Sequence, residues 1–227
     1  MQPAARRRLA VAISAALVCH SVFALGVGAM VLNMGVGMTL GLGGVPGPWS
    51  WAVNLALLLQ FALGHSLLLT EWGRRVLAGL APRPFGADLA PTTYVAIAGL
   101  QVLLLFAGWT PSGTIWWQAQ GSALPVMTAL YLGAWALLGK ALLDAGLGLQ
   151  SGVVGWWAVL RGKRPRYPDL PTRGLFRFIR QPIYASFALT TWTVPTWTPD
   201  QLLVASVLTG YCLVGPLLKE RRFAHLF

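Results

Sequence analysis

Long apolar segments restrict the possible folds of this chain more than any other feature of its sequence. Six runs dominated by apolar residues lie at about 9–32, 49–70, 91–109, 123–143, 182–195 and 200–218. A helix needs about 20 residues to cross the roughly 30 Å hydrocarbon core of a bilayer, and the run at 182–195 is too short to do so comfortably. We therefore expect an all-α, polytopic membrane bundle of about six helices, in which four spans precede a C-terminal helical hairpin.

The composition agrees with a membrane protein and excludes the main alternatives. The 227 residues are 56% hydrophobic and only 10% charged, against roughly 25% charged in an average soluble domain. A soluble globule needs more polar surface than this, and a disordered chain has far fewer apolar residues. One domain is the default at this length, so residues 1–227 are expected to form a single membrane domain.

The basic residues predict how the bundle lies in its membrane. If the N-terminus is cytoplasmic and the spans alternate, all 17 Lys and Arg fall on the cytoplasmic side, as the positive-inside rule describes. Both termini are therefore expected in the cytoplasm. Tryptophans at the opposite ends of the segments are expected to form an interfacial belt, and they are Trp49, Trp51, Trp109, Trp116, Trp117, Trp192 and Trp197.

The excess of positive charge does not indicate nucleic-acid binding, because the basic residues lie beside apolar spans and form no long solvated arm. Anionic membrane lipids are the expected neighbours. The longest polar stretch, 144–181, would then be cytoplasmic. It is too short for a separate domain, so we expect it to form a cap over the cytoplasmic ends of the helices, where a water-soluble ligand would meet the protein.

Common catalytic motifs are missing from the sequence. It contains no HExxH, no Walker loop and no GxGxxG after a strand, and its cysteine and histidine spacing does not suggest a metal site. Intramembrane acids and rows of polar residues are also lacking, which disfavours a proton-driven transporter or an ion pore. Cys19 and Cys212 lie in apolar runs and are expected to pack as small core residues.

The densest group of candidate functional residues lies where the basic stretch meets the fifth apolar run. It reads Gly174-Leu175-Phe176-Arg177-Phe178-Ile179-Arg180-Gln181-Pro182-Ile183-Tyr184. Pro182 suits the first turn of a helix, whose free N–H groups favour an anion. Arg180 adds a planar donor fork that suits a carboxylate. A hairpin would return Glu220 to the same end, so the set could hold a zwitterionic cofactor. A basic rim with one stabilising ion pair is the plain alternative.

Histidines inside the apolar runs are the other polar candidates. His65 and Ser66 lie toward the inner end of the second run, where they could form either an interhelical hydrogen bond or part of a site. His20 lies in the middle of the first run, and its position favours a role in packing.

The C-terminal group resembles the signature of the small integral-membrane methyltransferases, which include isoprenylcysteine carboxyl methyltransferases and phospholipid N-methyltransferases. Their pattern is approximately Gly-x-Tyr-x-x-x-Arg-His-Pro-x-Tyr, then a helical hairpin, then Glu-Glu. The similarity extends to one branch, methanethiol S-methyltransferase and the NnrU-type proteins, in a Phe…His-Ser element, a basic loop, a Tyr-Val and a Trp-x-Pro. These stand here as Phe61…His65-Ser66, Arg74-Arg75, Tyr94-Val95 and Trp109-Thr110-Pro111.

This resemblance implies S-adenosylmethionine as cofactor, held between the hairpin and the cap. It implies a small thiol or lipophilic methyl acceptor and a bacterial inner membrane, with the active site facing the cytoplasm. The cofactor-binding residues that it implies are Arg180, Pro182, Tyr184, Glu220 and Gly174. The catalytic residues that it implies are Gln181, Tyr184 and His65.

Three positions depart from the family pattern. Gln181 replaces the usual His and cannot titrate, Lys219 replaces the first Glu, and Phe176 lacks the usual phenol. These departures motivate an alternative function, in which a catalytically degenerate protein of the same fold acts as an assembly factor or as a subunit of a membrane complex.

Overall fold

The computed structural model describes the backbone of residues 3–223 and the side chains of residues 3–217. The elements that it describes are α1 (Pro3–Gly35), α2 (Trp49–Leu68), α3 (Glu71–Leu80), α4 (Gly86–Ala107), β1 (Trp117–Gln118), α5 (Ala123–Asp144), α6 (Leu147–Gln150), α7 (Val153–Arg161), η1 (Gly174–Arg177), α8 (Pro182–Trp192), β2 (Thr196–Trp197) and α9 (Pro199–Phe223). Five helices of this part of the chain are long and apolar enough to cross a membrane: α1, α2, α4, α5 and α9. The expected polytopic helix bundle is confirmed.

The C-terminal hairpin also forms as expected. The 11 residues of α8 are too few to cross a bilayer, and α8 packs against α5 and α9. Pro182 occupies the first turn of α8, where its missing N–H costs no hydrogen bond. The helix ends at Trp192, three residues before Pro195, which cannot continue it.

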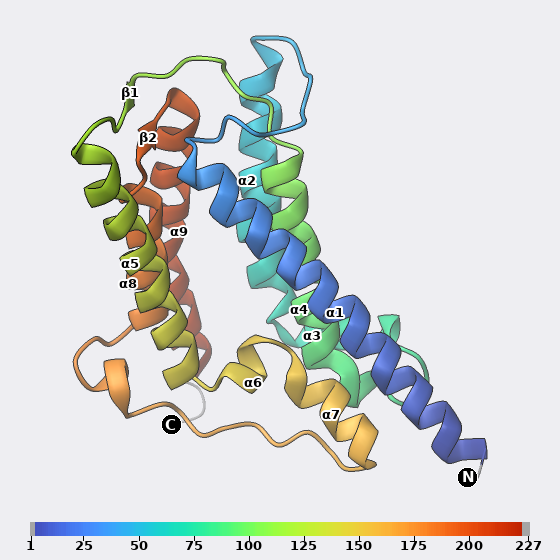
Figure 1. Cartoon of the computed structure of the whole chain (residues 1–227). Helices are drawn as coiled ribbons and strands as arrows, with labels where there is room; N and C mark the ends of the chain where they lie inside the picture. The colour runs from blue at the N-terminus through green and yellow to red at the C-terminus, as the bar shows by residue number, and fades with distance from the viewer. Residues whose placement is uncertain (1–2, 224–227) are drawn as a thin grey trace.

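The helices fall into two groups (Figure 1). The first contains α1, α2 and α4, with α3 and α7 packed at one end, and the second contains α5, α8 and α9. The two groups meet at the end that carries β1 and β2 and diverge toward the end where α1 begins and α9 ends. Helices α6 and α7 connect the groups across this divergent end.

A buried apolar cluster joins the two groups in the half of the bundle nearer β1 and β2. Its members come from both groups: Met30, Met34, Met38, Leu58, Phe61, Leu105, Phe106, Trp109, Tyr131, Val194, Val204 and Leu208. The phenol of Tyr131 on α5 donates to the carbonyl of Val31 on α1 at 2.6 Å. The two groups are therefore packed against each other in this half of the bundle.

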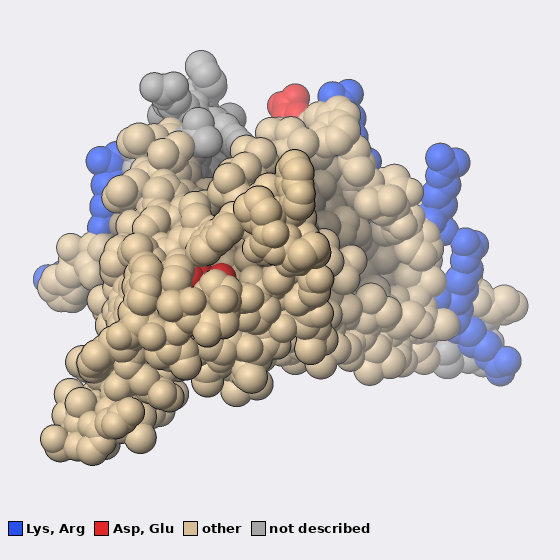
Figure 2. Space-filling model, turned by 90° about the horizontal axis from the view of Figure 1, so that it is seen from above, with Lys and Arg blue, Asp and Glu red and all other residues tan. Residues whose placement is uncertain are grey.

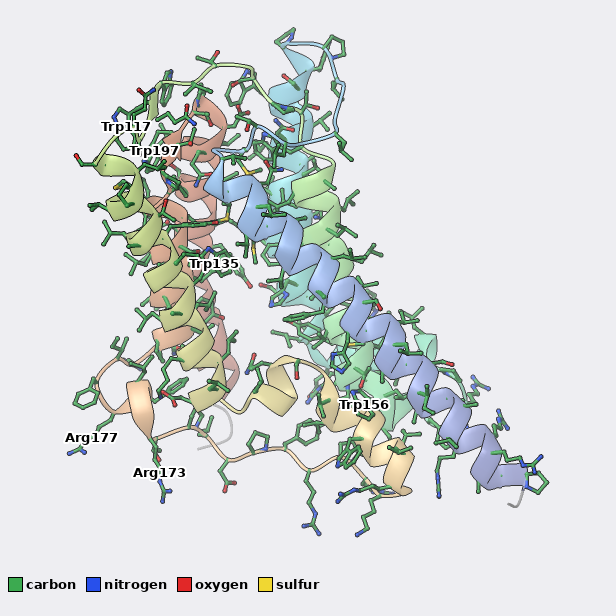
Figure 3. The ribbon with its side chains drawn as sticks, in the orientation of Figure 1. Trp117, Trp135, Trp156, Arg173, Arg177 and Trp197 are labelled. Atoms are coloured by element: carbon green, nitrogen blue, oxygen red, sulfur yellow. The ribbon has the colours of Figure 1, made fainter. Side chains whose placement is uncertain are left out.

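Trp109 does not belong to the interfacial belt in which the sequence analysis placed it. Its side chain is fully buried, and its indole Nε1 donates to Asp200 Oδ1 at 3.0 Å. The other predicted belt residues fit the expectation better: Trp49, Trp51, Trp116, Trp117 and Trp192 are exposed. Trp117 pairs with Trp197 in the antiparallel β1–β2 ladder, which lies at the end of the bundle opposite Arg173 and Arg177 (Figure 3).

Small residues allow α1 and α4 to pack with their backbones in contact. A Cβ atom at Gly26 would lie 2.5 Å from the carbonyl oxygen of Gly99, and a Cβ at Gly99 would lie 3.0 Å from Phe23 Cα. Glycine at these positions permits the close helix approach that stabilises helix pairs in lipid.

The cap predicted at 144–181 contains more helix than the sequence analysis foresaw, namely α6, α7 and η1. Helix α7 is docked on α4, because Thr92 Oγ1 donates to the carbonyl of Gly152 at 2.7 Å. Trp156 Nε1 lies 3.1 Å from His20 Nε2, which agrees with the structural role expected for His20. Residues 162–173 form an irregular strap that crosses back to η1.

The described Lys and Arg gather at the cap end of the molecule. Arg7 Nη2 donates to the carbonyl of Arg83 at 2.7 Å, and the guanidinium of Arg161 lies 4.5 Å from the centre of the Trp157 ring. Viewed from above Figure 1, Lys and Arg side chains project only at the margins of the face (Figure 2). The charge asymmetry read from the sequence is thus a property of the folded molecule.

Candidate functional site

The start of α8 brings several of the predicted residues together. Gln181 precedes the helix with φ −132° and ψ 66°, and its side chain does not cap the helix. Pro182 is buried, whereas Arg180 is exposed just before it. Because the first N–H groups of a helix have no intrahelical acceptor, this terminus offers hydrogen-bond donors and a partial positive charge beside a guanidinium.

Tyr184 lies one half-turn further along α8 and packs on α9. A Cβ at Gly215 would lie 3.0 Å from Tyr184 Cε1, so glycine lets the phenol ring rest on the backbone of α9. The ring centre lies 6.4 Å from that of Tyr211, at an interplanar angle of 59°. The phenol is thus held at the junction of the two hairpin helices.

His65 lies in an aromatic cluster formed by α2, α4 and α9. Its Nε2 lies 2.7 Å from the hydroxyl of Tyr94, and its ring centre lies 5.2 Å from that of Phe61 and 6.5 Å from that of Tyr211. Ser66 Oγ donates to the Tyr211 hydroxyl at 3.3 Å. His65 Nδ1 is buried and has no hydrogen-bond partner among the side chains described here.

Tyr211 connects the two parts of the candidate site. It contacts the ring of His65 on one side and the ring of Tyr184 on the other. A row of aromatic side chains therefore runs from Tyr94 on α4, through α2 and α9, to Tyr184 on α8. The row spans both helix groups, so it links two predicted catalytic residues, His65 and Tyr184.

Gly174 lies at a different contact. Its φ of +62° is a conformation that favours glycine, and a Cβ there would lie 2.2 Å from Asp144 Oδ2. The backbone N–H of Leu175 donates to the same oxygen at 2.8 Å. In the structure, Gly174 thus makes room for a carboxylate at the end of α5.

Glu220 and Lys219 fall in the last part of α9, whose side chains lie outside the described residues. The predicted convergence of Glu220 with Arg180 therefore stays a prediction. The course of α9 back to the cap end agrees with the hairpin on which that prediction depends (Figure 1).

Two hollows open beside Tyr167 on the strap. One, of about 510 Å³, is lined by Glu71, Arg74, Arg75, Ala78, Ala87, Ala90 and Tyr167. The other, of about 340 Å³, is mainly apolar and is lined by Gly146, Gly148, Leu149, Val154, Arg166, Tyr167 and Pro168. The first residue that lines the second hollow, Gly146, follows Asp144 by two positions in the sequence.

Tyr211 and Asp144 are the site residues that sequence reasoning missed. A lone tyrosine inside the last apolar run is a polar group in a membrane span, which is a signal for a functional position. Asp144 stands four residues after Lys140, a spacing at which opposite charges pair on a helix. Neither signal says which other helix the side chain meets.

Comparison with known proteins identifies the family. No protein-family model and no solved structure matches the chain. Methanethiol S-methyltransferase 1 of Bradyrhizobium diazoefficiens is 31% identical over 176 residues, which cover 77% of this chain and 60% of that protein. The methanethiol S-methyltransferase of Mycobacterium tuberculosis is 30% identical over 174 residues, which cover 74% of this chain and 68% of that protein. The chain belongs to the membrane methyltransferase group that includes these proteins.

The same membrane methyltransferase group contains a relative whose name states no activity. Nurim of Rattus norvegicus is 31% identical over 176 residues, which cover 71% of this chain and 63% of nurim. The matched part of the chain spans only 60% of the length of the Bradyrhizobium protein. Family membership therefore establishes the kind of protein, and its activity and acceptor are matters for proposal.

Proposed function

We propose that this protein is an integral-membrane methyltransferase that moves a methyl group from S-adenosylmethionine to a small thiol or lipophilic acceptor. The observation that carries the proposal is the aromatic row that joins His65 to Tyr184, beside the donor-rich start of α8. The similarity to proteins named methanethiol S-methyltransferase supports a thiol as the acceptor.

The described donor set fits the charged end of S-adenosylmethionine. The cofactor carries a carboxylate, which the free amides at the start of α8 and the Arg180 guanidinium would bind. Tyr184, half-buried at the same helix turn, would hydrogen-bond a polar group of the cofactor, and Glu220 would bind its ammonium. Gly174 has no side chain to bind the cofactor. It would contribute by allowing the backbone conformation that leads into η1.

The mainly apolar hollow of about 340 Å³ under the strap fits a flat aromatic base, since ligand sites are commonly apolar clefts of about 300 Å³ or more. Tyr167 forms part of its wall and offers a ring for stacking. We place the nucleoside end of the cofactor here, next to the cap segment that leads to α8.

When bound, S-adenosylmethionine supplies a methyl group on a positively charged sulfur, so the leaving group is already good. The residues of this chain would then align the acceptor and remove its proton. With the ring proton on Nε2, His65 donates to the Tyr94 oxygen and presents a lone pair at Nδ1. Because a thiolate is far more nucleophilic than a thiol, transfer of the thiol proton to His65 Nδ1 would activate the acceptor. Gln181 would hydrogen-bond a reacting group without titrating.

The basic cap end would face the cytoplasm of a bacterial inner membrane, with both termini on that side. The cofactor would then arrive from water through the cap, and a lipophilic or volatile acceptor would arrive through the membrane. Anionic lipids would be neighbours of the exposed Lys and Arg side chains at this interface.

The test is cofactor binding and methyl transfer by the full chain in lipid nanodiscs. Calorimetric titration with S-adenosylmethionine is expected to show saturable binding, and methyl-labelled cofactor with methanethiol is expected to give labelled dimethyl sulfide. Arg180→Gln and Glu220→Ala are expected to weaken binding at least tenfold. Arg164→Gln, which removes the same charge from the exposed strap, is the matched control. No saturable binding to the folded wild-type chain would refute the proposal.

A second candidate function is a non-catalytic role as an assembly factor or complex subunit. The similarity to nurim and the presence of Gln181 in place of the family histidine favour it. It predicts co-purification with a stoichiometric membrane partner and no transfer of labelled methyl groups to any component of a lipid and metabolite extract.

A further inference from the structure

Asp144 occupies an unusual position for an acidic residue. It is the last residue of α5, where the unpaired carbonyl groups of a helix give a partial negative charge that disfavours a carboxylate. Its side chain is only 15% exposed, so water does little to offset this repulsion. A carboxylate at this end of α5 is therefore expected to be stabilised by contacts with other groups.

The contacts of the carboxylate show what offsets the repulsion. Lys140, one helix turn earlier, forms an ion pair with Asp144 Oδ1. The other oxygen, Oδ2, accepts the backbone N–H of Leu175 at 2.8 Å. Leu175 belongs to η1. Arg173, the residue just before η1, does not cap this helix with its side chain. Asp144 therefore caps the start of η1 from another element, across 31 residues of chain.

The backbone at Gly174 is shaped to this contact. Its positive φ turns the strap into η1, and the absence of a Cβ lets the backbone approach the carboxylate, since a Cβ would lie 2.2 Å from Oδ2 and 2.6 Å from Oδ1. Pro182, the first residue of α8, lies eight positions after Gly174. The contact thus fixes the near end of the segment that carries Arg177, Arg180 and Gln181.

We propose that Asp144 is a positioning residue, which anchors η1 to the end of α5 and thereby holds the segment 177–181 in place to bind the cofactor at the start of α8. Lys140 keeps the carboxylate charged and oriented. The proposal rests on the proposed function, because it assigns a purpose to this anchor through the cofactor. It also explains why a glycine begins the sequence pattern at 174: the residue leaves space for the anchoring oxygen atoms.

The experiment compares full-length variants in nanodiscs by two independent measurements. The first is amide hydrogen exchange of the segment 174–177 without cofactor, and the second is the KM for S-adenosylmethionine against kcat. Asp144→Ala is expected to raise both the exchange rate and the KM at least tenfold, while kcat at saturating cofactor changes less than threefold. Asp144→Asn keeps an oxygen that can accept the Leu175 N–H, so it is expected to recover most of the loss.

Two further variants make the outcome decisive. Asp169→Asn removes the same charge from an exposed position on the strap and is expected to match the wild type. Gly174→Ala leaves α5 unchanged and is expected to reproduce the faster exchange, which covers the case in which Asp144→Ala does not fold. Wild-type exchange in Asp144→Ala, or in Gly174→Ala where Asp144→Ala does not fold, would overturn the anchor. So would a kcat that falls as much as kcat/KM. If the wild type binds no cofactor, the proposed function fails and the exchange measurement still decides the anchor.

Discussion

The Nε2 atom of His65 on α2 lies 2.7 Å from the hydroxyl oxygen of Tyr94 on α4. One ring nitrogen is therefore engaged, while the other, Nδ1, is buried without a partner among the described side chains. A buried polar atom that makes no hydrogen bond costs free energy. An acceptor proton delivered to Nδ1 would give this atom a function, and two predictions about catalysis follow from that geometry.

His65→Ala is expected to lower kcat for methanethiol methylation about 100-fold or more at neutral pH, the usual contribution of a general base. The difference in kcat between His65→Ala and the wild type is expected to shrink as the pH rises. At higher pH a larger fraction of the thiol is already ionised in solution and needs no base. Gas chromatography of dimethyl sulfide across a pH series measures both effects. His20→Ala, which removes a histidine that contacts Trp156, is the control. A pH-independent deficit would show that His65 does not take the proton.

Tyr94→Phe removes the hydroxyl that orients the imidazole while it keeps the ring. We expect kcat to fall about fivefold, which corresponds to the roughly 1 kcal/mol of a single neutral hydrogen bond. The KM for S-adenosylmethionine should stay near the wild-type value, since Tyr94 lies on α4, far along the aromatic row from α8. A selective rise in that KM would place Tyr94 in cofactor binding instead.

The close contact of α1 and α4 gives a prediction about stability. Gly26→Ala places a methyl group 2.5 Å from the carbonyl oxygen of Gly99, so the helices must separate. We expect a loss of about 1–3 kcal/mol, as for other overpacked positions, seen as a lower midpoint of thermal unfolding in nanodiscs. Gly28→Ala is a matched control on the same helix, because its Cβ would meet no atom within 4 Å. Equal midpoints for the two variants would contradict the close contact.

The buried Asp200 gives a second prediction about stability. It is 2% exposed and accepts hydrogen bonds from Trp109 Nε1 at 3.0 Å and from the Ser112 backbone N–H at 2.9 Å. Trp109→Phe removes one hydrogen-bond donor from this buried side chain, which costs about 1–3 kcal/mol. The unfolding midpoint is expected to fall by about 5 °C for a chain of this size. Trp116→Phe, at an exposed tryptophan of the same end, should leave the midpoint unchanged.

The orientation of the bundle can be checked by cysteine labelling. Cys19 and Cys212 are buried, so the native chain should react little with a membrane-impermeant maleimide. Thr114→Cys is exposed at the β1–β2 end and is expected to react in intact bacterial spheroplasts. Asp169→Cys on the strap should react only after the membrane is permeabilised. The reverse pattern would invert the proposed topology.

Local sequence features predicted the helices and their broad arrangement. The fourth apolar run, predicted at 123–143, is α5 at Ala123–Asp144, and Pro182 begins α8 as its position in the pattern indicated. The third run was predicted to open at Pro91, but α4 begins five residues earlier at Gly86. Pro91 lies inside α4, beyond its first turn, so the helix continues through it at the cost of one backbone hydrogen bond.

The amphipathic helix α3 shows the limit of a reading based on long apolar runs. Its polar and apolar residues alternate with helical spacing, and Thr70 caps it by accepting the Gly73 N–H at 3.1 Å. A capped helix of 10 residues is too short to form a long apolar run. Its signal in the sequence is the helical spacing of polar and apolar residues, which differs from that of a membrane span.

By itself, the sequence determined that the chain forms membrane helices, where they lie and which of their ends carry positive charge, because hydrophobicity and charge act residue by residue against the bilayer. Only the tertiary structure decided that Trp109 turns inward to Asp200, that Tyr211 bridges His65 and Tyr184, and that Gly174 yields space to Asp144. Each of these pairs residues on different helices. Such pairings depend on how helices rotate and tilt against one another, and no local pattern encodes that rotation.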